Sequence, residues 1–423
     1  MARRSEPSAT VDMMSMMATR ESKTLLRCSS AFRLMLATSW LAPEQWQDHQ
    51  NRAIRALLSS GLNWDEYLEL IERHSTPALS WETLKRMPEA NLPETVRQTL
   101  QQHSAACRMR AMRLASLLIQ VLKDFNQAGI PLIPLKGPLL SLELYGDLGI
   151  RHSRDIDIMV ALGDVTKAQA QLEEMGWRVY LQPCMFSPRH TEVFLQIDRH
   201  LVYWHPLQQC RLELHWHTRR ETLDCTAGQW ARSVTSVWSG LSYRALNPVD
   251  LAIHLCTHGS EHAWFRSKWL GDLARMYAAN YVDWNAVYLT ASAAGLENSL
   301  LQCLRLLEEL HGLPVPKALR KSAGSLPALL LDRVAACMLG PPEIHPSPFL
   351  ARLRMTVRRL RYERLLRPRR PWRQAFTEVA YSSVDFRLLR LPDRLFWLYV
   401  PLRPILWIRR CLWHIEQKPP GTA

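Results

Sequence analysis

Two aspartates, Asp155 and Asp157, stand two residues apart in the segment DIDIMV, where polar and apolar residues alternate as in a strand. Side chains two apart on a strand share a face, so both carboxylates point one way and Ile156 and Ile158 point the other. Neighbouring carboxylates repel each other unless a cation holds them. The pattern predicts a divalent metal site for Mg²⁺ (or Mn²⁺), which prefers oxygen ligands. The alternative interpretation is a solvated strand edge.

A third carboxylate, Glu213, lies in the segment RLELH, which also alternates. Arg211, Glu213 and His215 share one face, and Leu212 and Leu214 share the other. If this strand lies beside DIDIMV, Glu213 joins the two aspartates. Three carboxylates can hold a pair of metal ions that activate an attacking oxygen and stabilise a leaving pyrophosphate. Taken alone, Glu213 would be an ordinary surface residue.

Phosphate-binding features precede the aspartates. Lys136-Gly137 follows the apolar run 130–135 and opens a short helix at Leu139–Tyr145. A strand-to-helix turn offers backbone N–H groups to phosphate oxygens, and Lys136 adds a positive charge. The loop that follows supplies further candidates for contacts with a triphosphate, namely Arg151, Ser153 and Arg154.

Regular elements must position these residues. We expect strands at 130–135, 155–160, 177–181, 193–197, 201–204 and 211–216, and an amphipathic helix at 164–175 that ends at Gly176. Helical patterns precede this unit, including a long helix from about Glu94 to Gln127. Helix returns at Asn247, a capping residue followed by Pro248 and, three residues after the cap, Asp250.

The fold class that follows is α+β, a minimal mixed sheet flanked by helical N-terminal and C-terminal regions. We divide the chain into a disordered leader (1–29), a helical N-terminal domain (30–127), an α/β core (128–246), a helical domain completing the active-site cleft (247–340) and a basic, Trp/Leu-rich helical region (341–423). The leader lacks the apolar run of a signal peptide, so export is not expected.

The order of these motifs resembles a known family. Leu135-Lys136-Gly137, Tyr145-Gly146-Asp147 and the run from Arg151 to Asp157 are similar to the signature of uncharacterised nucleotidyltransferases of the polymerase-beta-like superfamily. The likeness covers roughly residues 60–320. It includes Leu212 to Trp216 and the segment Lys268-Trp269-Leu270-Gly271-Asp272.

The resemblance implies a nucleotidyltransferase sheet, a divalent metal and an NTP such as ATP. It implies Asp155 and Asp157 as metal ligands and Glu213 as the third carboxylate. Two departures stand out: Pro138 replaces a residue that would offer an N–H or hydroxyl to phosphate, and the third acid is Glu where Asp is commoner. The resemblance also makes His258 and Asp272, with His215, possible residues of the cleft wall.

Three histidines, His254, His258 and His262, recur every four residues and lie on one helical face. A polar face that packs on the α/β core is the favoured interpretation, and a dedicated zinc site is the other. The nine cysteines include no C-x-x-C pair and are odd in number, which fits a reducing cytoplasm of a bacterial cell better than a disulfide framework.

The net charge of +14 is concentrated at the C-terminus. Residues 350–423 hold 17 Lys and Arg against 5 Asp and Glu, a balance of +12. Arginines interleaved with Leu, Trp and Phe predict either helices that pack on the body with solvated arginines, or contact with an anionic partner such as the inner membrane surface through residues 350–415. No signature of specific nucleic-acid binding is present.

The sequence therefore predicts an enzyme that moves a nucleoside monophosphate from an NTP to a hydroxyl of an acceptor, which is a small molecule, a peptide or a protein. Two alternatives remain. One is a silent nucleotide-binding or regulatory module that keeps the fold without the chemistry. The other is a membrane-surface protein that acts through the basic C-terminal region.

Overall fold

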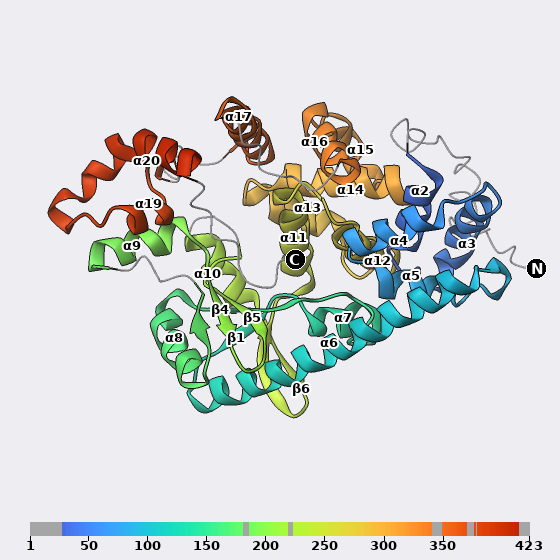
Figure 1. Cartoon of the computed structure of the whole chain (residues 1–423), viewed down its shortest axis with the longest axis horizontal. Coiled ribbons are helices and arrows are strands. Elements are labelled where there is room, and N and C mark those ends of the chain that lie inside the picture. Colours follow the sequence, from blue (N-terminus) through green and yellow to red (C-terminus); the bar gives the residue numbers. More distant parts are fainter. Residues whose placement is uncertain are drawn as a thin grey trace, which may run out of the picture.

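The structure is a computed structural model of the 423-residue chain. It describes residues 28–180, 186–218, 223–340, 349–369, 376–377 and 379–413. Nearly all of the predicted leader, residues 1–27, lies outside the described residues. Helices surround a five-stranded mixed sheet, so the predicted α+β class is confirmed (Figure 1).

The N-terminal part is helical. Its helices are α2 (Ser30–Thr38), α3 (Glu44–Leu58), α4 (Trp64–Arg73), α5 (Pro77–Leu84), the 3-10 helix η2 (Pro88–Ala90) and α6 (Glu94–Gln127). Local signals set where α2 and α4 begin, because the side chains of Ser29 and Asn63 accept the backbone N–H groups of Phe32 and Glu66.

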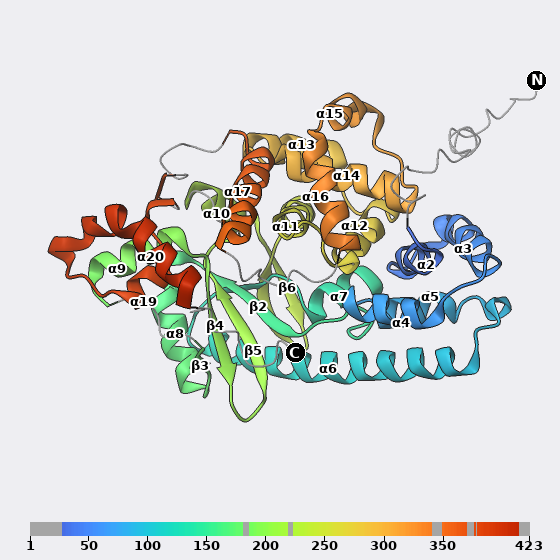
Figure 2. The same cartoon turned by 45° about the horizontal axis from the view of Figure 1, so that its top comes forward.

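Helix α6 connects two cores. Near its start, Val96 and Leu100 pack into the core formed with the other N-terminal helices and with helices of the second half of the chain. Towards its end, Leu118 and Phe125 pack under the sheet. Figure 2 shows this helix running along the base of the molecule from the N-terminal helices to the strands.

The sheet has the strand order β1-β2-β5-β4-β3. Its strands are β1 (Leu132–Pro134), β2 (Asp155–Val160), β3 (Arg178–Val179), β4 (His200–His205) and β5 (Cys210–His215). β2 and β5 run parallel, and the other neighbours pair antiparallel. Helices α7 (Pro138–Tyr145), α8 (Val165–Glu174) and α9 (Pro188–Ile197) connect these strands, with the short η3 (Leu162–Asp164) before α8.

The two faces of the central strands differ in polarity. Ile156, Ile158, Leu212 and Leu214 are buried on the face that packs in the core under the sheet. The other face carries the polar residues of both strands, as the alternation predicts. This face looks towards the helices of the second half of the chain.

One predicted strand is wrong. Residues 193–197 belong to helix α9, which begins at Pro188 because Ser187 caps it through its side chain. Val193, Phe194 and Ile197 then form a buried stripe at helical spacing. A separate hairpin was not predicted. It follows α10 (Leu223–Arg232) and consists of β6 (Val234–Trp238) and β7 (Leu241–Ala245).

The second half is helical again. It contains α11 (Pro248–Glu261), α12 (Ser267–Ala278), α13 (Trp284–Ala293), α14 (Glu297–His311), η4 (Lys317–Leu319), α15 (Arg320–Gly324) and α16 (Ala328–Leu339). The predicted start of α11 is confirmed, because Asn247 accepts the N–H of Asp250 through its side chain. Helix α11 crosses above the polar face of the sheet (Figure 1).

The C-terminal helices are α17 (Phe349–Leu366), α19 (Ser383–Leu388), η5 (Asp393–Leu398) and α20 (Tyr399–Trp413). Phe386, Phe396 and Tyr399 are buried against His190 of α9, so part of this region packs on the body. Within the described residues no single helix is long and apolar enough to cross a membrane. Only when taken together do two helices joined at a bend, Lys317–Gly324 and Ala328–Leu339, reach that length and hydropathy.

Candidate functional site

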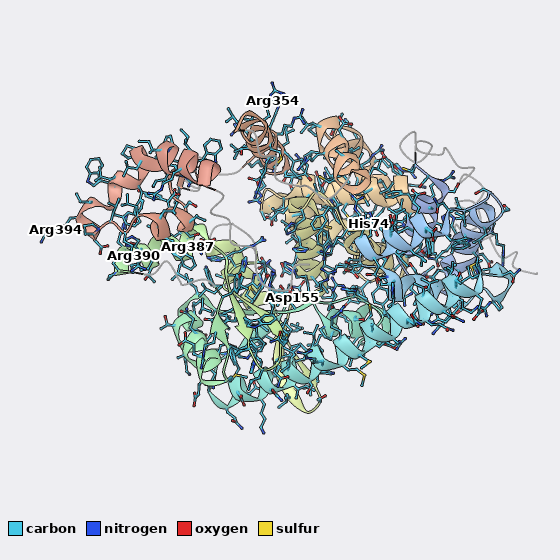
Figure 3. All side chains as sticks on the ribbon, in the orientation of Figure 1. His74, Asp155, Arg354, Arg387, Arg390 and Arg394 are labelled. Atoms are coloured by element: carbon cyan, nitrogen blue, oxygen red, sulfur yellow. The ribbon has the colours of Figure 1, made fainter. Side chains whose placement is uncertain are left out.

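The three predicted carboxylates come together on the polar face of the sheet. Strand register places Asp157 directly opposite Glu213, and Asp155 opposite Arg211. Because β2 and β5 are parallel neighbours, residues that are distant in the chain become side-by-side groups of one surface. Figure 3 shows Asp155 where the sheet meets the helices of the second half.

Positive groups contact all three acids. The Lys136 Nζ lies 3.6 Å from Asp157 Oδ1, and the Arg211 guanidinium contacts Glu213 and lies 3.9 Å from Asp155 Oδ2. The Nε2 atom of His215 lies 3.4 Å from Asp157 Oδ1 and 3.3 Å from Glu213 Oε2. Most of these contacts are longer than a good hydrogen bond, so the cluster is neutralised loosely.

The carboxylates have unequal affinities for protons. Burial, together with the neighbouring Asp157 and Glu213 charges, raises the pKa of Asp155. Burial acts in the same direction on Asp157, but Lys136 and His215 outweigh it and lower the pKa to about 2. Against burial, His215 and His200 hold the pKa of Glu213 well below its usual value. Coupled acids with pKa values driven apart are typical of sites that bind cations or move protons.

The Lys136-Gly137 turn links β1 to α7 beside these acids. Gly137 has φ +79°, a conformation that glycine adopts without strain, and a Cβ placed there would approach no atom closer than 3.8 Å. Backbone conformation therefore requires the glycine. Pro138 is the first residue of α7, and no side chain caps this helix. Pro138 has no N–H, so the N–H groups that this turn can present to an anion are those of Gly137, Leu139 and Leu140.

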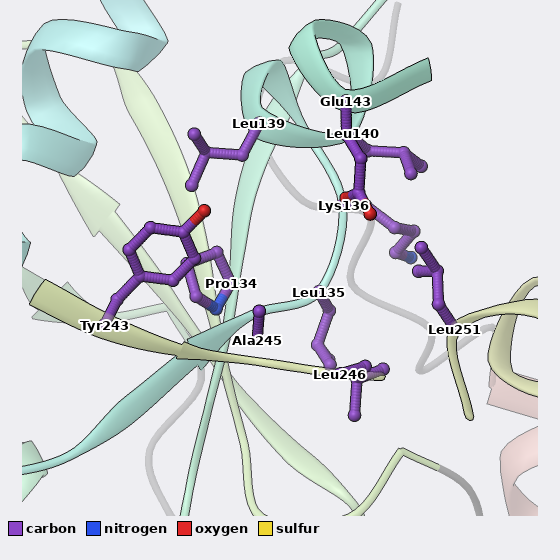
Figure 4. Close-up of a pocket in the computed structure, with 10 residues that line it drawn as sticks. All are labelled: Pro134, Leu135, Lys136, Leu139, Leu140, Glu143, Tyr243, Ala245, Leu246 and Leu251. Carbon is purple, nitrogen blue, oxygen red and sulfur yellow. The ribbon is translucent and has the colours of Figure 1, made fainter. Parts of the chain in front are cut away.

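A small pocket lies behind this turn, between α7 and β7 (Figure 4). Its volume is about 30 Å³, and its lining is mostly apolar. Such a volume holds about one water molecule. A nucleotide therefore cannot occupy this pocket, and the polar face of the sheet is the better candidate site.

Arg151 and Asp272 are joined to each other rather than open to solvent. The Nε of Arg151 donates to Asp272 Oδ2 at 2.8 Å, and Tyr145 donates to the other carboxylate oxygen at 3.2 Å. Both members of the pair are buried, with Arg151 3% and Asp272 0% exposed. Ser153, also buried, lies 3.5 Å from the Arg151 guanidinium. The structure thus makes our predicted phosphate ligand Arg151 and predicted wall residue Asp272 partners in an ion pair.

A basic group lies on the Asp155 side of the cluster. Arg154 is exposed, and its Nε donates to His152 at 3.2 Å. The ammonium group of Lys268 is buried and donates to the His152 carbonyl at 3.0 Å. Burial and the nearby Arg151 and Arg266 charges lower the pKa of Lys268 well below its usual value. We did not single out Lys268 or Arg266 from the sequence, although Lys268 begins the segment that resembles the family.

Aromatic rings form a wall beside Lys136. His258 and His262 lie 4.8 Å apart, and Trp269 lies 4.9 Å from His258, between ring centroids. Phe265, 38% exposed, contacts Trp269 at 4.9 Å. Burial and the Lys136 charge lower the pKa of His258 well below its usual value. The role of His258 as a wall residue stays a prediction.

The backbone after α11 adopts an uncommon conformation. Ala263 and Trp264 both have positive φ, 47° and 54°, so the chain reverses sharply after α11. The indole of Trp264 folds back onto Gly259, where a Cβ would lie 2.3 Å from the ring. Conformations of this kind persist where packing imposes them, often at functional sites.

An ion-pair chain reaches the site from the C-terminal region. Glu261 accepts from Arg199 at 2.7 Å and from Arg367 at 2.6 Å. Opposing the effect of burial, these two arginines lower the pKa of Glu261 to about 2. Arg367 follows α17, so the basic region contributes a charge that pairs with Glu261 of α11.

His200 completes the floor and was missed by the sequence analysis. Its Nε2 lies 3.9 Å from Glu213 Oε2, and its ring stacks on His215 with centroids 4.9 Å apart. Because β4 and β5 pair antiparallel, His200 stands directly opposite His215. No local pattern marks His200, since its role depends on strand register.

Comparison with known proteins gives one match. A family model described as uncharacterised nucleotidyltransferase matches residues 60–312, which include the whole sheet and α11 and α12. No curated protein and no solved structure matches the chain.

Proposed function

The chain belongs to this family of uncharacterised nucleotidyltransferases, and from that premise we propose that it is an enzyme that transfers a nucleoside monophosphate from an NTP to a hydroxyl of an acceptor. The observation that carries the proposal is the set of three carboxylates on adjacent parallel strands, placed beside the Lys136-Gly137 turn. Nucleotidyl transfer needs this combination, because the substrate is a polyphosphate and the leaving group is pyrophosphate.

The donor set fits a divalent cation. Asp155, Asp157 and Glu213 lie on neighbouring parallel strands and offer carboxylate oxygens, the ligands that Mg²⁺ and Mn²⁺ prefer. When bound, such a cation neutralises charge on the phosphates and lowers the barrier to attack on phosphorus. The long contacts of Asp157 with Lys136 and His215, and of Asp155 with Arg211, support the proposal, since weakly held carboxylates are available for other ligands.

The residues of the chain then have distinct tasks. Lys136 and the N–H groups at the start of α7 hold the β- and γ-phosphates, and Arg154 with Lys268 supports the triphosphate from the other side. The acceptor hydroxyl, activated beside Glu213, attacks the α-phosphorus in line and releases its proton to solvent. The bond between the α-phosphorus and the bridging oxygen breaks, and pyrophosphate leaves. The rings of His262 and Phe265 give a base or acceptor a surface to stack on.

The test is calorimetric titration of each NTP with Mg²⁺ into wild type, Asp155→Ala/Asp157→Ala and a control with two exposed aspartates removed, Asp48→Ala/Asp332→Ala. We expect wild type and control to bind one nucleotide alike, and the site variant to lose that binding. Equal binding by all three proteins would refute the metal–triphosphate site. Binding in wild type without turnover on any acceptor would favour the silent regulatory module instead.

A separate observation favours membrane contact as a second activity. Trp397 and Ile405 are each 62% exposed on the C-terminal helices, where Arg390 and Arg394 are also exposed (Figure 3). Exposed aromatic and aliphatic groups beside arginines suit an anionic lipid surface. We therefore propose that the protein is cytoplasmic and contacts the inner membrane surface peripherally through this region.

Co-sedimentation with anionic vesicles tests this second proposal. We expect wild type to pellet at low salt, Trp397→Ser/Ile405→Ser to stay in solution, and the control Leu289→Ser, which removes an exposed leucine elsewhere, to behave as wild type. If wild type stays in solution at every salt concentration, or if the double variant pellets like wild type, the membrane proposal is wrong.

A further inference from the structure

We propose that His200, Glu213 and His215 form a second cation position, selective for a transition metal such as Zn²⁺, Mn²⁺ or Co²⁺. The ligand atoms of these three residues all lie within 4.8 Å of one another. Among the described residues, this is the group of three or more His, Cys, Asp or Glu side chains that comes close enough to hold one ion.

The distances suit a shared ion. Oε2 of Glu213 lies 3.3 Å from Nε2 of His215 and 3.9 Å from Nε2 of His200. Two ligands of a tetrahedral ion at about 2.1 Å lie about 3.4 Å apart. Small side-chain shifts therefore bring all three atoms to bonding distance.

The backbone already holds the two imidazoles together. His200 and His215 form a directly opposed pair of the antiparallel β4 and β5 strands, and their rings stack at an angle of 28°. His215 and Glu213 are buried, while the side chain of His200 is 27% exposed. The position is thus preorganised by strand register and open to exchange with solvent on one side.

Glu213 can serve this position and keep its other contact. Its Oε1 atom accepts from Arg211, whereas Oε2 faces the two histidines. Asp157 lies beside the same position, with Oδ1 3.4 Å from His215 Nε2. An ion held by the three ligands would therefore have a fourth oxygen close by and room for a water or substrate oxygen.

The donor atoms decide the class of ion. Mg²⁺ and Ca²⁺ take oxygen ligands almost exclusively, whereas imidazole nitrogens favour Zn²⁺ and other first-row transition ions. Two imidazoles with one carboxylate are a ligand set that zinc enzymes use with one open position. The aspartate pair and the histidine pair would therefore select different ions within one cleft, and Glu213 borders both.

This inference deepens the proposed function, because it assigns an ion to the second side of the same cleft. Its test needs no nucleotide and no turnover. Metal-free full-length protein is titrated with Co²⁺, and visible absorption reports coordination by nitrogen. Mn²⁺ bound to the same protein is examined by pulsed electron paramagnetic resonance for coupling to imidazole nitrogen.

Four variants are compared with wild type. His200→Ala should weaken Co²⁺ binding by about 100-fold or more and reduce the nitrogen coupling. His103→Ala, which removes an exposed histidine on α6, should leave both signals unchanged. Asp155→Ala should keep the Co²⁺ signal while losing Mg²⁺-dependent NTP binding. His200→Gln, of similar volume, controls for misfolding, and circular dichroism checks every variant.

The outcomes separate the two proposals. Unchanged Co²⁺ absorption in His200→Ala and His200→Gln, or no nitrogen coupling in wild type, would overturn the histidine site while leaving NTP binding intact. Loss of NTP binding in Asp155→Ala with a retained Co²⁺ signal would support both positions. A Co²⁺ signal in wild type that requires His200, without any NTP binding, would support the metal position and reject the transfer reaction.

Discussion

Two groups of buried charge differ in how the fold pairs them. Arg151 and Asp272 form a closed pair with a 2.8 Å contact, and Tyr145 satisfies the second carboxylate oxygen. On the polar face of the sheet, three carboxylates share Lys136, Arg211 and two histidines, and apart from the close Arg211–Glu213 contact these distances are 3.3 to 3.9 Å. The contacts of the first group are short, and most contacts of the second group are long.

This difference in contact length distinguishes a group that stabilises the fold from a group that can bind a cation or a proton. A buried ion pair with short hydrogen bonds is costly to break and has no capacity left for a ligand. A cluster of coupled acids with long contacts costs stability and keeps its lone pairs for a cation or a proton. Charge density alone would rank the two groups alike, whereas contact geometry distinguishes them.

The largest expected effect is on the reaction, through the cluster. Asp157→Asn should reduce NTP turnover by about 10⁴-fold, which corresponds to about 5 kcal/mol of barrier, because a cation ligand is lost. Steady-state kinetics with the nucleotide identified by calorimetry measures this. Full activity in the variant would show that the cluster is structural like the pair.

The next effect is on stability, through the pair. Asp272→Asn should lower the free energy of unfolding by about 3–5 kcal/mol, because Arg151 remains buried without a countercharge. Urea unfolding followed by circular dichroism measures this. The double variant Arg151→Met/Asp272→Leu should recover most of the loss. If Asp272→Asn unfolds like wild type but no longer binds NTP, the pair belongs to the substrate site after all.

The third prediction concerns how the stability of the fold depends on pH through Glu261, which pairs with Arg199 and Arg367. Its pKa is lowered to about 2, so its charge stabilises the fold above the unfolded value near 4.5, and this contribution is lost as pH falls towards 2. Glu261→Gln should lower stability at pH 7 by about 2 kcal/mol and make the decline between pH 5 and pH 3 shallower. Parallel pH curves for the two proteins would contradict this.

The smallest expected effect is a gain in thermal stability. The pKa of Asp155 is raised, so at neutral pH its charge opposes folding, and Asp155→Asn should raise the thermal midpoint by about 1–2 °C without added metal. Asp157→Asn should lower the midpoint, because the pKa of Asp157 is lowered. Differential scanning calorimetry compares them. If both variants shift the thermal midpoint in the same direction, the predicted electrostatic difference between Asp155 and Asp157 is wrong.

Much of the floor of the cleft was predictable from local patterns. Alternation in DIDIMV and RLELH predicted the face of each carboxylate, and the Lys136-Gly137 turn was predicted at the end of a strand. The strand predicted at 193–197 was wrong because a short apolar run fits helix and strand equally, and the Ser187-Pro188 start signal decided for helix.

Sequence by itself determined the fold class and the face on which Asp155, Asp157 and Glu213 lie, because backbone periodicity and turn chemistry are local properties. Only the tertiary structure decided which charges find partners. Arg151 is neutralised by a residue 121 positions later, and His200 meets His215 through strand register. Such pairings depend on how distant elements pack, and no periodicity along the chain encodes them.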